Sequence, residues 1–107
     1  MMDDLYEKFL PQFVDLARVR LERALETIAR SDPNAMTAVI RELHAIAGEA
    51  GLLGLGPIMG LARQAEDLAK RLRDSSATDA SPLVAALEEL KQALERVGPK
   101  NKPGGGA

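Results

Sequence analysis

The stretch RELHAIAGEAGLLG, residues 41–54, decides how the rest of the chain is organised. It contains His44, the only histidine among 107 residues, and two glycines, Gly48 and Gly51, in a segment that otherwise favours a helix. A glycine inside a helix costs about 1 kcal/mol relative to alanine, so both need a reason. We expect that reason to be access and close approach. Gly48 follows His44 by one helical turn and would leave the imidazole uncovered.

Apolar residues recur at helical spacing on both sides of this stretch. They predict four helices joined by short connections, at residues 12–30, 33–53, 57–74 and 81–97. Pro11 is expected to break or kink the chain after a short lead-in helix at residues 4–10. Short connections make successive helices antiparallel neighbours. The sequence therefore predicts an all-α protein, an antiparallel up-and-down four-helix bundle with a short N-terminal lead-in helix.

The predicted helix that carries His44 has a clear buried face, formed by Met36, Val39, Ile40, Leu43, Ile46, Ala47, Ala50 and Leu53. The last helix is expected to stop at Gly98. Residues 99–107 are rich in glycine, proline and lysine. We interpret residues 1–98 as one domain and residues 99–107 as a flexible tail or linker.

Composition excludes several classes of function. Apolar residues are 46% of the chain and aromatic residues 3%, so leucine and alanine must fill a helical interior. The absence of cysteine excludes a disulfide scaffold and fits a reducing compartment. No apolar run approaches the roughly 20 residues that span a bilayer, and the acidic N-terminus is unlike a signal peptide. The net charge of -2 gives no general attraction to nucleic acid. We expect a cytoplasmic protein without a membrane or nucleic-acid partner.

The geometry of a helical hairpin places a carboxylate beside the histidine. His44 lies roughly 80° from the centre of the buried face, a position that is partly buried and partly wet. The midpoint of the turn between the second and third helices is near Leu55. His44 is eleven residues before it and Glu66 eleven after it, so the two should lie at the same height. A carboxylate there would orient the imidazole and leave its other nitrogen as a nucleophile.

Further residues are candidates for contacts around the site. Arg41 and Arg63 could bring positive charge near an anion on His44. Leu52, beside Leu55 and Ile58, is expected to provide an apolar docking patch. We expect no metal site, because haem, di-iron or zinc ligation needs more histidines or inward carboxylates than the chain offers.

Simpler interpretations of the same residues stay open. A single histidine on a helix can be an ordinary flank residue, and Glu66 can be a solvated carboxylate. Gly48 and Gly51 can instead allow close helix packing, Gly51 more so because it lies nearer the core. The chain as a whole could be a docking or dimerisation module in which His44 has no chemical role.

The segment HAIAGEAGLLG at residues 44–54 resembles the motif of histidine-containing phosphotransfer (HPt) domains, which include the P1 domains of chemotaxis-type histidine kinases. The shared features are the histidine, a glycine four residues later, a small residue at position 50 and an apolar residue followed by Gly54. The similarity extends over the helices from Leu5 to Val97. Glu66 matches the glutamate that partners the histidine in P1-type members. The family usually has lysine three residues after the histidine, where this chain has Ala47.

The resemblance implies a phosphorelay intermediate rather than an enzyme with its own ATP site. His44 would accept a phosphoryl group, by the resemblance on Nε2, from a histidine kinase or from the aspartyl phosphate of a receiver domain. It would then pass the group to a response-regulator receiver aspartate. The domain itself needs no cofactor, since the receiver would supply Mg²⁺. The resemblance implies a monomer, either a free-standing relay protein or the P1 part of a larger kinase.

Overall fold

The computed structural model of the protein describes residues 2–30, 34–75 and 79–97, with side chains from Glu7 onward. Four helices account for nearly all of these residues: α1 (Met2–Ala29), α2 (Ala35–Leu52), α3 (Gly56–Asp74) and α4 (Ser81–Val97). No described residue lies in a strand. Pro33, the predicted first residue of the second helix, and the predicted tail at residues 99–107 lie outside the described residues.

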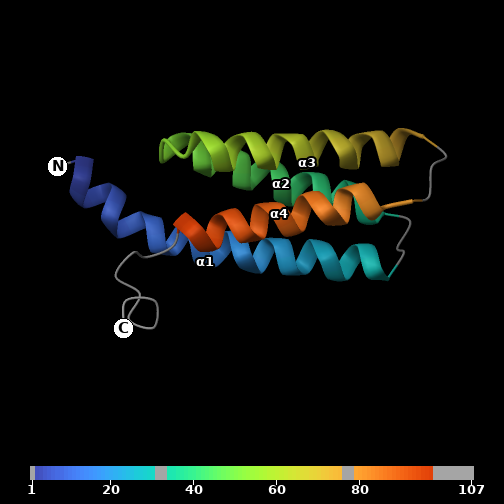
Figure 1. The fold of residues 1–107 in the computed structure, drawn as a ribbon, viewed down its shortest axis with the longest axis horizontal. Coiled ribbons are helices and arrows are strands. Elements are labelled where there is room, and N and C mark those ends of the chain that lie inside the picture. The colour runs from blue at the N-terminus through green and yellow to red at the C-terminus, as the bar shows by residue number, and fades with distance from the viewer. Residues whose placement is uncertain (1, 31–33, 76–78, 98–107) are drawn as a thin grey trace.

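The helices form a four-sided bundle in which each helix packs against two neighbours (Figure 1). Helix α1 packs beside α2 and α4, and α3 packs beside α2 and α4, so the diagonal pairs α1–α3 and α2–α4 lie further apart. Successive helices run in opposite directions, so α1 begins and α4 ends at the same end of the bundle (Figure 1). The predicted all-α, up-and-down four-helix bundle is confirmed.

Leucine and alanine fill the core, as the low aromatic content requires. Each helix contributes fully buried apolar side chains, among them Leu21 from α1, Leu43 from α2, Ile58 from α3 and Leu87 from α4. Five of the eight residues predicted for the buried face of α2 are buried, and the other three pack against the core from its edge. Each of the first three helices buries alanines, among them Ala17, Ala50 and Ala65, and their small methyl groups favour close packing of the helices.

The N-terminal part of the chain differs from the prediction. Residues 4–10 do not form a separate lead-in helix, because α1 runs through Pro11 without interruption. Proline removes one backbone hydrogen bond, and the helix changes direction near this end (Figure 1). With 28 residues α1 is much longer than the 17 to 19 residues of the other helices, so its first turns extend past the end of the bundle.

The turn between α2 and α3 is fixed by backbone hydrogen bonds. The N–H of Leu55 donates to the carbonyl of Ala50 at 2.8 Å, and the N–H of Gly54 donates to the carbonyl of Gly51 at 3.2 Å. This pair of bonds is a Schellman motif, and Gly54 occupies its left-handed position with a φ of 74°. The motif turns the residue after the glycine inward, so Leu55 is buried.

An ionic cluster ties α1 to α2. The guanidinium of Arg20 lies 3.6 Å from Glu42 and 3.4 Å from Glu49, and Arg23 lies 3.5 Å from Glu42.

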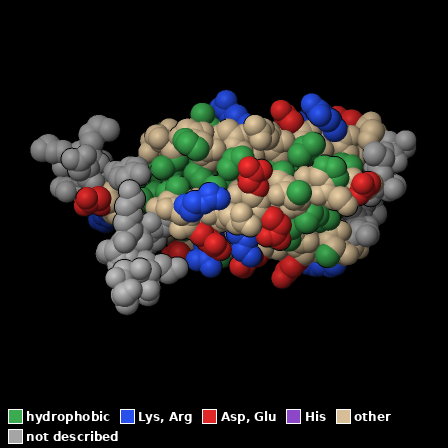
Figure 2. Space-filling view, viewed as in Figure 1, with side chains coloured by type: hydrophobic (Ala, Val, Ile, Leu, Met, Phe, Trp, Pro, Cys, Tyr) green, Lys and Arg blue, Asp and Glu red, His purple; other side chains and the backbone are tan. Residues whose placement is uncertain are grey.

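The face of the bundle on which α4 lies carries a mixture of acidic and basic side chains, with no histidine in view (Figure 2). His44 therefore does not open onto that face.

Candidate functional site

His44 projects from the middle of α2 into solvent, with 80% of its side chain exposed. Its Nδ1 lies 3.3 Å from Oε2 of Glu66 on α3. The antiparallel hairpin brings the two together across 22 positions of sequence, at the matched height that the sequence predicts. Glu66 is the only charged residue among the described ones that is buried, with its side chain 10% exposed.

The carboxylate defines how the ring can react. An ionised carboxylate can only accept hydrogen bonds, so the contact assigns the ring proton to Nδ1. The lone pair is then on Nε2, the nitrogen that faces away from Glu66. A neutral imidazole in this tautomer is a nucleophile directed toward solvent. The negatively charged Glu66 can stabilise positive charge that develops on the ring.

A lysine that was not predicted as a site residue also contacts Glu66. Nζ of Lys70 lies 3.4 Å from the same Oε2 atom of Glu66. Lys70 follows Glu66 by four residues on α3, the spacing at which helical side chains pair. That spacing is visible in the sequence and could have identified Lys70.

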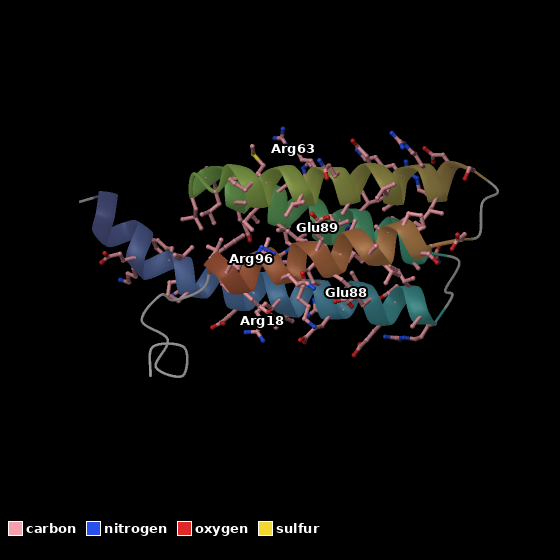
Figure 3. All side chains as sticks on the ribbon, in the orientation of Figure 1. Arg18, Arg63, Glu88, Glu89 and Arg96 are labelled. Carbon is pink, nitrogen blue, oxygen red and sulfur yellow. The ribbon has the colours of Figure 1, made fainter. Side chains whose placement is uncertain are left out.

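The two arginines proposed as phosphate contacts lie further out. Arg41 and Arg63 are exposed and form no ion pair within the described part of the chain. Arg63 points outward from α3, away from the bundle (Figure 3). The structure therefore leaves both available to a partner but does not bring them to Glu66, as it does Lys70.

The two glycines of α2 have different surroundings. A Cβ on Gly48 would meet nothing within 4 Å, so the surface beside His44 is open. A Cβ on Gly51 would lie 3.1 Å from Sδ of Met59 on α3. Gly51 thus permits close packing of α2 on α3, whereas no packing contact accounts for Gly48.

Ala47 occupies the position three residues after the histidine, and it is buried with 4% exposure. A side chain there points into the bundle and not toward the imidazole. The chain therefore has no positive charge at position 47. The cation that contacts Glu66, Lys70, comes from α3 instead.

Of the three residues predicted for the docking patch, only Leu52 is exposed. Leu52 is 89% exposed, the largest exposure of any described bulky apolar residue. Leu55 and Ile58, in contrast, are core residues with 9% and 1% exposure and cannot form a docking surface. Leu55 is turned inward by the Schellman motif, and Ile58 lies on the inner face of the first turn of α3.

The apolar surface beside Leu52 is formed with α1. A groove of about 380 Å³ lies between the two helices, lined by Phe9, Gln12, Phe13, Leu16, Glu49, Leu52 and Leu53. Phe9 and Leu16 are 44% and 43% exposed. The α1–α2 groove was not predicted from the sequence, because residues 4–10, which include Phe9, were expected to form a separate lead-in helix before a break or kink at Pro11.

Among the described residues, no three of histidine, aspartate and glutamate gather where they could hold a metal ion. Within the same residues, no helix combines the length and apolarity that crossing a membrane requires.

The site is thus an exposed histidine on a helical bundle, paired with a largely buried carboxylate. A family model described as Hpt domain matches residues 6–98, and the chain therefore belongs to the Hpt domain family. Members of this family act in phosphorelay signalling, where they carry phosphoryl groups between kinases and receiver domains and lack a catalytic ATP site of their own. Comparison with curated proteins and comparison with solved structures each gave no match.

Proposed function

We propose that His44 accepts a phosphoryl group on Nε2 from a histidine kinase or a receiver aspartyl phosphate and passes it to the aspartate of a response-regulator receiver domain. The observation that carries this proposal is the exposed imidazole whose Nδ1 is held by a largely buried carboxylate. The domain supplies the nucleophile and its orientation, and the receiver supplies the acidic pocket with Mg²⁺. We place this activity in the cytoplasm, in keeping with a chain that has no cysteine.

The transfer step conserves atoms and charge in a simple way. The lone pair of Nε2 attacks phosphorus, an N–P bond forms, and the bond from phosphorus to the aspartyl oxygen breaks, which releases the receiver carboxylate. The proton stays on Nδ1, so the ring becomes positively charged. Glu66, at 3.3 Å from Nδ1, stabilises that positive charge. Most of the remaining catalysis is positioning, because the transferred group needs an aligned approach.

The receiver is proposed to dock along the exposed ridge of α2. His44, Gly48 and Leu52 follow one another at intervals of four residues, so they lie on one face of the helix. Leu52 is about 12 Å from His44 along the helix axis. The open surface at Gly48 allows the receiver to approach the His44 ring closely. The α1–α2 groove, which Leu52 lines, offers an apolar surface for the receiver to contact.

The test of the function is a transfer assay with wild-type protein and His44→Gln. Each is mixed with phosphorylated receiver domains or with a histidine kinase and ATP, and acid-labile, base-stable phosphate is measured on this chain. We expect label on the wild type and none on the variant. Equal label on both would refute His44 as the acceptor. Binding of receivers without label on the wild type would favour a pure docking module.

The docking surface is tested with Leu52→Ser against Val19→Ser as the matched control. Val19 is also an exposed apolar residue, 46% exposed, but it does not line the groove. We expect Leu52→Ser to weaken receiver binding about tenfold, the effect of losing a central apolar contact, while Val19→Ser leaves binding unchanged. Equal affinities for both variants would place the docking surface elsewhere.

A further inference from the structure

One oxygen atom of Glu66 contacts two positively polarised groups. Oε2 lies 3.3 Å from Nδ1 of His44 and 3.4 Å from Nζ of Lys70. The carboxylate is largely buried, whereas the lysine side chain is 46% exposed. His44, Glu66 and Lys70 thus form a short chain of contacts from α2 to α3, with the carboxylate at its centre.

We propose that Lys70 is a positioning residue for His44 and acts through Glu66. It fixes the orientation of the Glu66 carboxylate, so that Oε2 stays directed at Nδ1 and the imidazole keeps its proton on Nδ1 and its lone pair on Nε2. The consequence for phosphoryl transfer rests on the proposed function, whereas the effect on the imidazole tautomer does not.

The position of the Glu66 carboxylate decides which ring nitrogen is reactive. The ammonium of Lys70 holds Oε2 by a charge-assisted contact at 3.4 Å, and the same oxygen accepts a hydrogen bond from Nδ1–H of His44 at 3.3 Å. A carboxylate that turned away from the ring would free the ring proton to move to Nε2. The solvent-facing nitrogen would then have no lone pair for the attack.

Helix geometry explains why Lys70 reaches this carboxylate. Side chains on a helix lean toward its N-terminus, so the ammonium of residue 70 lies over the residue one turn earlier. On α2 the position three residues after His44 is the buried Ala47 and cannot supply a cation. Lys70 therefore places on α3 a positive charge that α2 does not provide.

The competing interpretation is an ordinary ion pair at i,i+4 spacing that only supports the α3 helix. Both interpretations allow a small loss of helix stability when Lys70 is replaced. They differ in the state of the His44 ring, because an ordinary pair has no reason to change which nitrogen carries the proton. The ring tautomer is therefore the discriminating readout.

The test uses full-length wild type, Lys70→Met, Lys70→Arg and the control Lys91→Met, which removes a lysine on α4. Nitrogen NMR of the single histidine at neutral pH reports the tautomer. Phosphoramidate, a small phosphoryl donor that needs no docking surface, reports the reactivity of the ring.

We expect the Nδ1–H tautomer in the wild type and a smaller Nδ1–H fraction in Lys70→Met. The phosphorylation rate of Lys70→Met should fall by roughly threefold or more. Lys70→Arg should restore both readouts and Lys91→Met should change neither.

An unchanged tautomer in Lys70→Met would overturn the proposal, as would a change of the same size in Lys91→Met. If the wild type takes no phosphate from any donor, the proposed function fails, but the tautomer measurement still decides the role of Lys70. The two failures are therefore distinguishable.

Discussion

Nδ1 of His44 and Oε2 of Glu66 lie 3.3 Å apart, although the residues belong to different helices. The contact joins a ring that is 80% exposed to a carboxylate that is 10% exposed. A contact of this kind leaves the reactive nitrogen accessible and keeps its partner sheltered from solvent. The orientation of the imidazole therefore depends on the rigid α2–α3 hairpin and not on a mobile surface contact.

Replacement of Glu66 by alanine should slow phosphoryl transfer by about tenfold or more, because a hydrogen bond to a charged group is worth roughly 1.5–3 kcal/mol. It should also change the tautomer of the imidazole, which nitrogen NMR reports. Asp67→Ala removes the adjacent, exposed carboxylate and serves as the control. A tautomer identical to wild type in Glu66→Ala would show that the two side chains do not interact in solution.

We expect Gly48 to provide access to the His44 ring at some cost in stability. Its Cβ position is open, so Gly48→Ala should raise the free energy of unfolding by about 0.5–1 kcal/mol. Gly48→Leu should still fold but lose most phosphotransfer, because a branched side chain would cover the ring. Gly60→Ala, at another open position on a helix, should be stabilising without any effect on transfer. Normal transfer in Gly48→Leu would remove the access argument.

Much of the site could be predicted from the sequence, since the α2–α3 hairpin has a symmetrical turn. Glycine and proline mark its ends, and counting outward from Leu55 pairs His44 with Glu66. The burial of Leu55 itself was not predictable from apolar spacing, because the Schellman motif, and not helical periodicity, directs that residue inward.

The N-terminal part of α1 could not be predicted correctly from the sequence. Local preference predicts a break or kink at Pro11, and α1 continues through this residue because a long helix tolerates one lost hydrogen bond. Exposure of Phe9 and Leu16 depends on where α1 leaves the bundle, which is a tertiary property. The α1–α2 groove could therefore not be found from sequence alone.

Introducing lysine at Ala47 tests the burial of that position directly. The structure gives Ala47 4% exposure, so Ala47→Lys should lower the free energy of unfolding by about 1–3 kcal/mol through overpacking. It should not speed transfer. Chemical denaturation and the transfer assay measure the two effects. A faster variant with unchanged stability would mean that a side chain at residue 47 reaches the phosphoryl group after all.

Gly54 should be required for the turn that aligns α2 and α3. Its positive φ makes Gly54→Ala unfavourable by roughly 1–2 kcal/mol. Gly56→Ala is the matched control, because Gly56 is two residues away and a Cβ there would be in open space. Thermal denaturation compares the two variants, and equal melting temperatures would contradict the assigned Schellman geometry.

Asp79 should make the start of α4 sensitive to acid. Hydrogen bonds from Ser81, the hydroxyl first and then the backbone N–H, hold the pKa of Asp79 below its ordinary value. A lowered carboxyl pKa contributes stability above the pKa of the unfolded chain and loses it as pH falls through the folded pKa. Asp79→Ala should therefore be less stable than wild type at neutral pH, and the difference should shrink on acidification. A difference that is constant with pH would show that the carboxylate charge plays no part.

The position of the phosphoryl group on the imidazole tests the central claim most directly. The wild-type protein is phosphorylated by a receiver domain or by phosphoramidate, and phosphorus and nitrogen NMR identify the substituted atom of His44. The account predicts phosphate on Nε2 with the proton retained on Nδ1. Phosphate on Nδ1, the nitrogen that Glu66 holds, or stable phosphate on any other residue, would contradict it.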